Sequence, residues 1–325
     1  MELKKETAIV IVNYQTPWHL QECLDAVYRT SKDFHVFVVH NKPDLRSIEI
    51  TNIFSSTHPG TITVIKNDKN LGFVEGVNSA YEKAKEYYRV CFLNSDTMVT
   101  GDWLSTLNQV LDSNPNVVQV APDFNHYYKE NGFIKYSKKL AYTLGEDIGN
   151  RVYKNLLQTY APRAEEKGFH LSNKFYEFCS GACNLARVEP FLERGFFFDP
   201  NIIHGYGDDF DTSYFLRQYG DIGATNDAYV IHFLNVSANK FKNEKTELRD
   251  KIKNYNILYV VSKWEERLSK ELEGKSSDEL LSLQQVSGEI EALLRFKGAK
   301  SINHDFKSYI DSIPARGLWE RLTAM

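Results

Sequence analysis

The stretch Phe92-Leu93-Asn94-Ser95-Asp96-Thr97 joins the end of a predicted buried strand to a polar loop. The strand is the apolar run 90–93, and such a run is typical of a strand covered on both faces. Open α/β sheets bind ligands at the carboxyl ends of their strands. A carboxylate there, in this case that of Asp96, can hold a hard divalent cation, which in turn can hold a diphosphate. We therefore expect nucleotide-binding side chains before Asp96 and chemistry-bearing ones after it, as far as His232.

Three further apolar runs precede this strand, and each is followed by a polar loop. They cover residues 8–12, 34–39 and 61–65, with helical spacing of apolar residues between them. Strands that alternate with helices favour parallel pairing and right-handed crossovers. The predicted fold class is α/β, with a mostly parallel central sheet flanked by helices and the polar loops gathered on one sheet edge.

The composition limits the classes of function. The 325 residues suffice for one large or two ordinary domains, and a net charge of -4 argues against a nucleic-acid partner. No apolar run approaches the roughly 20 residues of a membrane span, and the N-terminus lacks a signal-peptide pattern. The four cysteines form no zinc pattern and are predicted to be reduced thiols. These features predict a cytoplasmic protein.

Downstream of Asp96 the pattern changes twice. A helix is predicted over 103–111 and a strand over 117–121, but residues 123–176 lose regular periodicity, and loops of that length are usually functional. Near residue 240, Lys, Glu and Leu begin to dominate, with helical periodicity over 255–268 and 280–296. We predict one unit over residues 1–240, with an insertion over 123–176, and a helical C-terminal extension over 241–325.

A second candidate site is Gly205-Tyr206-Gly207-Asp208-Asp209-Phe210-Asp211. Helix capping and the helix dipole account for one or two acids at a helix start, but not for three acids behind two glycines. Crowded carboxylates have raised pKa values, which suits a general base.

Structural alternatives stay open for each segment. Asp96 can cap the next helix or complete a turn, and a histidine at a strand end such as His232 is more often structural. The segment Asn70-Leu71-Gly72-Phe73 can be a simple strand-to-helix turn. It contains neither the dinucleotide-binding glycine pattern nor a P-loop.

In order and spacing, these segments resemble glycosyltransferase family 2, which has the GT-A fold, and in particular its bacterial rhamnosyltransferase-like branch. The matching segments are Val12-Asn13-Tyr14-Gln15, His40-Asn41, Asn70-Leu71-Gly72-Phe73, Asn94-Ser95-Asp96, Gly181-Ala182, Gly207-Asp208-Asp209-Phe210-Asp211 and His232. Each segment is weak evidence alone, but the ordered set is specific. The resemblance leaves the insertion and the C-terminal extension uncovered.

The resemblance implies a Rossmann-like nucleotide-sugar half over 1–122 and an acceptor half over 123–240. It implies inverting sugar transfer from a nucleotide-diphosphate sugar, first of all a UDP- or dTDP-sugar. The acceptor would be a saccharide or lipid-linked saccharide in surface polysaccharide synthesis. The donor would be bound by Asn13, Gln15, His40, Asn41, Asn70, Gly72, Asn94 and Asp96.

The remaining roles follow in the same way. Asp96 and His232 would hold a divalent metal, Mn²⁺ or Mg²⁺. Asp209 would be the general base, supported by Asp208. The acceptor would be contacted by Gly181, Tyr206 and Asp211.

This chain departs from the family pattern at three positions. His40 replaces an Asp that accepts a hydrogen bond from uracil or thymine, and Asn94 replaces the first acid of the metal-binding DXD motif. Gln15 replaces an Asn. One acid fewer at the cation implies modest metal affinity, or a cation that arrives with the nucleotide.

Two other functions compete with transfer. A nucleotidyltransferase should carry glycines and basic residues after its first strand, and residues 13–17 have neither. A catalytically degenerate relative that binds a glycan or a protein is favoured by the changes at His40 and Asn94, and disfavoured by the three acids. The Lys-rich start of the extension could contact an anionic membrane surface. The alternative is a helical cap on the catalytic unit, or self-association.

Overall fold

The computed structural model describes residues 3–125, 146–160, 163–172, 177–234, 236, 252–253, 255–257 and 259–272. Much of the predicted insertion and the helix predicted over residues 280–296 lie outside this described part of the chain. The described residues of the insertion include one helix, at Glu146–Tyr160, and one short strand, at Phe169–Leu171.

The first half of the chain forms a parallel sheet with helical crossovers, as predicted. Its strands, in the spatial order β3-β2-β1-β4, are β1 (Lys4–Asn13), β2 (Phe34–Asn41), β3 (Ile62–Asn67) and β4 (Tyr87–Asn94). The crossovers are α1 (Pro17–Thr30), α2 (Leu45–Thr57), α3 (Gly72–Asn78) and α4 (Tyr81–Ala84). The helix predicted after Gly72 is thus two short helices.

The second half completes a mixed sheet of nine strands. Its strands are β5 (Thr97–Thr100), β6 (Val117–Phe124), β7 (Phe169–Leu171), β8 (Cys183–Arg187) and β9 (Asp221–His232). Strand β8 runs antiparallel between β4 and β6, while β9 is parallel to β6 and antiparallel to β5 and β7. The described helices are α5 (Trp103–Ser113), α7 (Glu146–Tyr160), α8 (Glu189–Arg194), α9 (Asp208–Leu216) and α11 (Glu265–Leu272).

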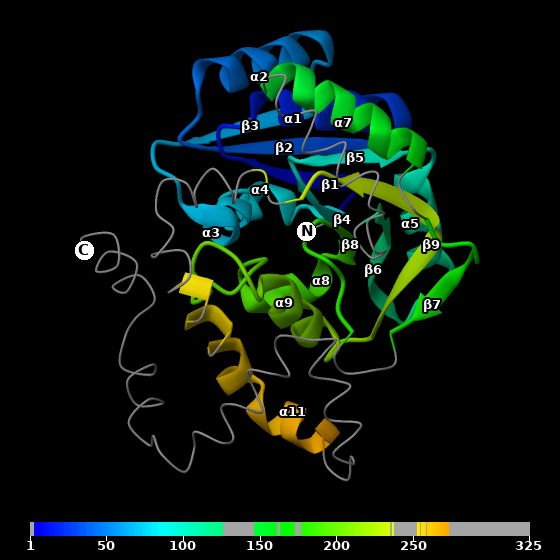
Figure 1. Ribbon diagram of the computed structural model, residues 1–325. Coiled ribbons are helices and arrows are strands. Elements are labelled where there is room, and N and C mark those ends of the chain that lie inside the picture. Colours follow the sequence, from blue (N-terminus) through cyan, green and yellow to red (C-terminus); the bar gives the residue numbers. More distant parts are fainter. Residues whose placement is uncertain are drawn as a thin grey trace.

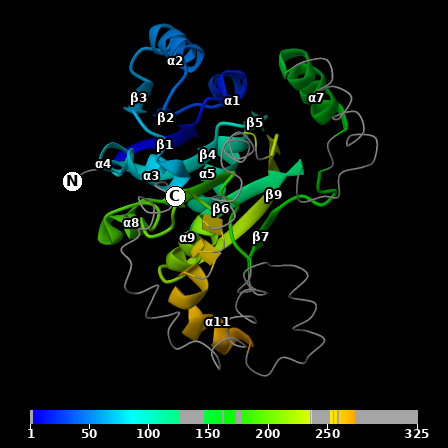
Figure 2. The same ribbon diagram turned by 60° about the vertical axis from the view of Figure 1, so that its left-hand side comes forward.

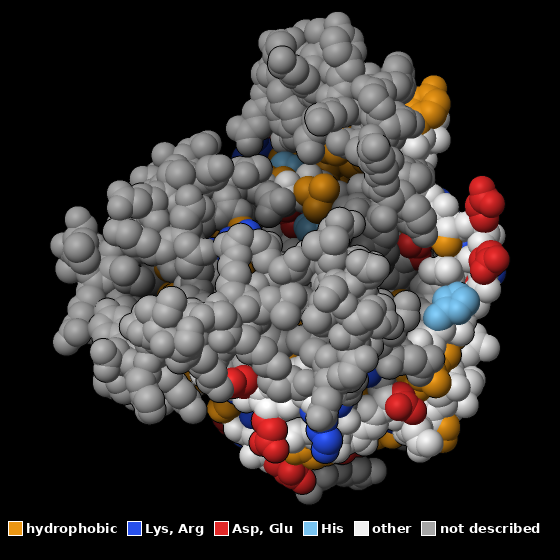
Figure 3. Space-filling model, turned by 60° about the horizontal axis from the view of Figure 1, so that its bottom comes forward, with side chains coloured by type: hydrophobic (Ala, Val, Ile, Leu, Met, Phe, Trp, Pro, Cys, Tyr) orange, Lys and Arg blue, Asp and Glu red, His pale blue; other side chains and the backbone are white. Residues whose placement is uncertain are grey.

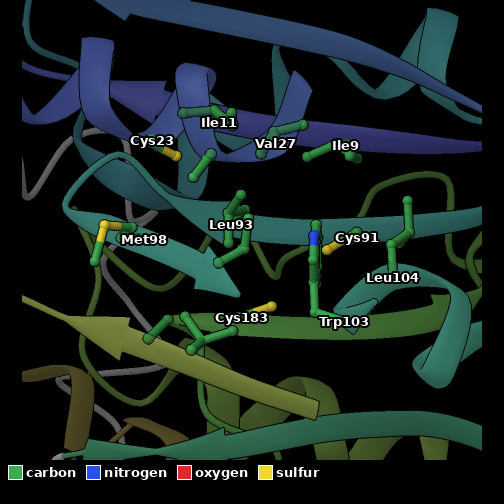
Figure 4. Close-up of a cluster of buried hydrophobic side chains, with 14 of the residues drawn as sticks. Ile9, Ile11, Cys23, Val27, Cys91, Leu93, Met98, Trp103, Leu104 and Cys183 are labelled. Atoms are coloured by element: carbon green, nitrogen blue, oxygen red, sulfur yellow. The ribbon is translucent and has the colours of Figure 1, made fainter. Parts of the chain in front are cut away.

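Helices cover both faces of the sheet. Figure 1 shows α1, α2 and α7 on one side and α3, α4, α8 and α9 on the other. Side chains alternate along β1, so Ile9 and Ile11 pack into one core while Val10 and Val12 pack into the other. Figure 4 shows the first of these cores, in which Ile9 and Ile11 lie near Val27 of α1. Two covered faces explain why the strand sequences are continuously apolar.

Helix α7 lies within the predicted insertion, where no regular element was expected from the sequence. Its Tyr153 and Leu157 are buried in the same core as α1, while Ile148 and Val152 remain exposed. Residues 123–176 were treated as irregular at the level of sequence, so this helix was not predicted, although its apolar residues do gather on one side.

The described residues from 252 to 272, here called the C-terminal segment, pack on the other core. Val260, Val261 and Leu268 are buried in the cluster that includes α9. In Figures 1 and 2 this segment runs beside α9, on the side away from α1. For these residues the structure matches the helical-cap alternative. Among the described residues, no helix is both long and apolar enough to cross a membrane.

Candidate functional site

A cavity of about 450 Å³ lies at the carboxyl edge of the parallel strands, within the usual size of small-molecule sites. Ten of the predicted site residues line it: Asn41, Asn70, Gly72, Asn94, Asp96, Gly181, Tyr206, Asp208, Asp209 and His232. Hydrophobic side chains line it as well. Figure 3 shows a hollow in which hydrophobic, acidic and histidine side chains are visible together, which is the composition of this lining.

Asp96 and His232 meet in this cavity although they are far apart in the sequence. Thr97 at the start of β5 pairs with His232 at the end of β9, and the Phe233 N–H donates to the Asp96 carbonyl at 2.9 Å. The strand pairing thus brings His232 Nε2 to 3.2 Å from Asp96 Oδ1. The sequence marked both residues as strand ends, and the sheet topology makes them neighbours.

The surroundings of Asp96 favour its ionised form. Burial raises the pKa of this carboxyl, but the neighbouring His232 and the N–H of Val236, at 3.1 Å from Oδ2, lower it overall to about 2. A carboxylate that stays charged in a buried position is suited to bind a cation.

The donor set fits a divalent cation that binds together with a phosphate ligand. No group of three or more His, Cys, Asp or Glu side chains able to hold a metal occurs in the described part of the chain. Asp96 and His232 would therefore supply two protein ligands, one oxygen and one nitrogen. Cations of the Mg²⁺ type commonly take their other ligands from substrate phosphates and water.

The two adjacent acids stand at the end of an unusual turn. Four consecutive residues have left-handed backbone conformations: His204 (φ 63°), Gly205 (φ 145°), Tyr206 (φ 75°) and Gly207 (φ 84°). Gly207 is the N-cap of α9, so Asp208 and Asp209 are its first two residues. Because left-handed non-glycine residues cost on the order of 1–3 kcal/mol each, contacts elsewhere must hold this turn.

Asp208 and Asp209 have different environments. Asp208 is buried, and burial followed by the charges of Asp209 and Asp211 raises its pKa well above the usual range. Asp209 is half-buried, and its Oδ2 accepts a hydrogen bond from the Gly181 N–H at 3.3 Å. A proton held by Asp208 relieves the repulsion between the two carboxyl groups. The Gly181 N–H can then orient the Asp209 carboxylate.

Gly72, which follows the loop after β3, joins that loop to the acid-bearing turn. It forms a β-bridge with His204, and a Cβ at Gly72 would lie 2.3 Å from His204 Cα. Asn41 Nδ2 donates to the Gly72 carbonyl at 2.7 Å, and Asn70 Oδ1 accepts from the Gly72 N–H at 3.0 Å. Asn41 and Asn70 therefore shape the cavity wall as well as line it.

Three predicted donor-binding residues do not line the cavity. Asn13 and His40 are buried, with Asn13 Nδ2 3.3 Å from His40 Nδ1 and His40 Nε2 3.2 Å from Thr51 Oγ1. Burial, aided by the charge of Lys66, lowers the pKa of His40 to about 4. Gln15 Nε2 donates to the Lys42 carbonyl at 3.2 Å. In this structure these three side chains contact other groups of the protein, and their contacts with the nucleotide stay predictions.

Asp211 also makes its contacts within the protein. Its carboxylate is completely buried and does not line the cavity. It pairs with Arg194 at 2.8 Å and Lys263 at 2.7 Å, and accepts a hydrogen bond from Trp264 Nε1 at 2.8 Å. The third acid therefore links α9 to α8 and to the C-terminal segment. Its contact with an acceptor stays a prediction.

Sequence reasoning missed other lining residues, among them Phe178, His204 and Ile252. His204 precedes the Gly-Tyr-Gly segment and could have been included with it. Ile252 belongs to the C-terminal segment, beyond the boundary predicted near residue 240, and nothing in its local sequence indicated a place in the site.

The chain is similar to known proteins in both sequence and structure. The family model described as "Glycosyl transferase family 2" matches residues 8–195. No curated protein sequence matches the chain.

Several solved structures have a similar fold. A mannosyltransferase from Pyrobaculum calidifontis, solved with GDP-Man and Mn²⁺, has a TM-score of 0.54 at 13% identity, over 99% of this chain and 80% of that one. S. aureus TarS 1-349 has a TM-score of 0.52 at 13% identity, over 89% of this chain and 81% of that one. GalNAc-T7, solved with UDP, GalNAc and Mn²⁺, has a TM-score of 0.51 at 15% identity, over 71% of this chain and 44% of that one. This chain thus spans less than half of GalNAc-T7, and identities this low establish the fold alone.

Proposed function

Because the chain belongs to glycosyltransferase family 2, we propose that it transfers a sugar, with inversion, from a nucleotide-diphosphate sugar to a saccharide or lipid-linked saccharide. The observation that carries this proposal is the presence of two carboxylate sites in one cavity, Asp96 with His232 and Asp208 with Asp209. The first suits a cation with a diphosphate, and the second suits removal of a proton. Following the resemblance, we assign the reaction to surface polysaccharide synthesis in the cytoplasm, with a hexose or deoxyhexose as the transferred sugar.

The proposed mechanism is a single displacement. Asp209 removes the proton from the acceptor hydroxyl while that oxygen attacks the anomeric carbon, and the bond from that carbon to the diphosphate breaks. The Gly181 N–H orients the Asp209 carboxylate at 3.3 Å. Asp96 and His232 would hold a divalent cation, which supplies positive charge to the leaving diphosphate. The Mn²⁺ in the mannosyltransferase and GalNAc-T7 structures supports Mn²⁺ or Mg²⁺ as this cation.

Thermal unfolding with nucleotide diphosphates and sugar nucleotides, each with and without Mn²⁺, tests the donor site. A ligand at 100 times its Kd should add about 2.7 kcal/mol to the free energy of unfolding. We expect a metal-dependent shift with one nucleobase, and we expect Asp96→Ala to abolish it. Asp102→Ala is the matched control, because Asp102 is exposed and its side chain makes no capping hydrogen bond to α5. No shift with any nucleotide would favour the degenerate binding relative instead.

The general base is tested by Asp209→Asn. Loss of a general base should lower the transfer rate by about 10²- to 10⁴-fold, with the nucleotide-dependent thermal shift unchanged. Asp221→Asn, at the exposed first residue of β9, should transfer at the native rate. Full activity of Asp209→Asn would remove this residue from the base role.

A further inference from the structure

The turn that carries the two acids is held by a side chain from the C-terminal segment. Asn256 is fully buried, and its Oδ1 accepts a hydrogen bond from the Ile203 N–H at 2.9 Å. Its Nδ2 donates to the Ile203 carbonyl at 2.7 Å and to the Gly205 carbonyl at 2.5 Å. One amide therefore satisfies three backbone groups at the start of the left-handed run 204–207.

Other residues of the C-terminal segment contact the same turn. Lys253 Nζ lies 5.5 Å from the centre of the Tyr206 ring, and Val260 Cγ2 would lie 3.3 Å from a Cβ at Gly207. Ile252 lines the cavity itself. The segment thus contacts this turn along its length and also forms part of the cavity wall.

We infer that Asn256 is a positioning residue for Asp208 and Asp209, acting through the 203–207 turn. Gly207 caps α9 and the acids follow it directly, so a displacement of the turn changes where both carboxyl groups point. Reacting groups that are misplaced by about 1 Å can lose about 10²-fold in rate. This inference rests on the proposed transfer reaction, and it adds a residue outside the segments that resemble the family.

The chain provides a matched control for a purely structural role. Asn78 Oδ1 accepts hydrogen bonds from the Phe197 N–H at 3.1 Å and the Phe198 N–H at 3.0 Å, and its Nδ2 donates to the Phe198 carbonyl at 2.8 Å. It therefore also makes three hydrogen bonds to a backbone segment. Neither Asn78 nor that segment lines the cavity.

The kinetic test compares Asn256→Ala with Asn78→Ala in the full chain. For Asn256→Ala we expect kcat to fall about 10- to 100-fold and the pH profile of kcat to move, with the KM for the donor within about twofold of native. Asn78→Ala should keep the native kcat per folded molecule and the native pH profile. Equal kcat and equal pH profiles in native protein and Asn256→Ala would overturn the inference. If Asn256→Ala does not fold, Asn256→Ser, which keeps one hydroxyl, is measured in the same way.

Amide hydrogen exchange separates this inference from the proposed function. We expect faster exchange at residues 203–211 in Asn256→Ala, with native exchange in the turn between β4 and β5. If native protein neither binds a nucleotide nor transfers a sugar, the proposed function fails, and the exchange result alone decides whether Asn256 holds the turn. Unchanged exchange at 203–211 would overturn the inference with or without activity.

Discussion

At the scale of single residues, the site separates two adjacent carboxyl groups by their environments. Asp208 is buried and bears the raised pKa, while Asp209 is half-buried, lines the cavity and accepts the Gly181 N–H. A folded state that binds a proton on Asp208 more tightly than the unfolded chain does must lose stability as pH rises. At neutral pH the buried acid pair should therefore lower the free energy of unfolding, and this loss can be measured.

Asp208→Asn should remove this loss. The stability that protonated Asp208 provides is fully present below about pH 4, the pKa of an unfolded Asp, and is lost as pH rises through the raised folded pKa. We expect the free energy of unfolding of the variant, relative to native, to be greater at pH 7 than at pH 4. Denaturant unfolding at several pH values measures it, with Asp221→Asn as the control. A difference that does not vary with pH would contradict the assignment.

Residues at the strand ends also show what sequence can and cannot reveal about a site. The polar strand ends were predictable, but which side chain reaches the cavity depends on alternation along the strand. Asn41 lines the cavity while the preceding His40 faces Asn13 and Thr51. A shift of one residue along a strand decides whether a side chain faces the cavity or the protein interior. The local sequence pattern does not give the strand register that sets this.

At the scale of elements, the loop that leads into α3 and the acid-bearing turn pack directly against each other. The Gly72–His204 bridge joins the first residue of α3 to the turn that precedes α9. The Phe73 N–H also donates to the His204 carbonyl. The distance between the loop at Gly72 and the acid-bearing turn therefore depends on a contact that only glycine permits.

Gly72→Ala tests this contact, and Gly60→Ala is its control. Both glycines have φ of +80°, but a Cβ at Gly60 meets nothing within 4 Å, whereas one at Gly72 meets His204 Cα at 2.3 Å. Gly60→Ala should lower the free energy of unfolding by about 1 kcal/mol, because alanine is strained in the left-handed conformation. Gly72→Ala should lower it by about 1–3 kcal/mol more, because its Cβ also overpacks against His204. Thermal unfolding compares the two, and nucleotide-dependent stabilisation should fall only in Gly72→Ala. Equal losses in both variants would show that the close approach is unimportant.

At the scale of the whole molecule, buried charge connects the C-terminal segment to the catalytic part. Lys263 lies 2.5 Å from Asp199 and 2.7 Å from the buried Asp211, and Tyr259 donates to Asp199 at 3.0 Å. This network and the Asn256 contacts are tertiary, and the helical periodicity of residues 255–268 gave no indication of the surface on which they pack. The ordered motifs predicted the fold and the sheet edge at which the cavity lies, but not the contribution of the C-terminal segment to its wall.

Lys263→Met should therefore destabilise the protein strongly. Removing one partner of a fully buried ion pair costs about 3–5 kcal/mol, and the partial exposure of Lys263 places its loss toward the lower end, with Asp199 and Asp211 left buried. Lys85→Met is the matched control: both lysine side chains are 29% exposed, but Glu82, the partner of Lys85, is 77% exposed. That variant should lose less than about 1 kcal/mol. Urea unfolding measures both, and equal losses would contradict a structural role for the buried network.

The loss in Lys263→Met should also depend on pH. Burial raises the pKa of Asp199, but Lys263 lowers it overall. The stability from this carboxylate is present above about pH 4 and is lost as pH falls through its lowered folded pKa. We expect the difference between native and variant to shrink in acid, and a difference that grows in acid would refute the pairing.

The buried cysteines supply native reporters of how the molecule opens. Cys23, Cys91 and Cys183 belong to the core beneath α1, and Cys179 belongs to the core beneath α9. Burial raises the pKa of Cys23 and of Cys179 to about 12, so neither thiol reacts readily until its surroundings open. Trapping with a thiol reagent, followed by mass spectrometry of the labelled peptides, therefore times the opening of each face separately. Equal labelling rates would mean that both cores open in one cooperative event. Earlier labelling of Cys179 would mean that the core beneath α9 opens locally while the other stays folded.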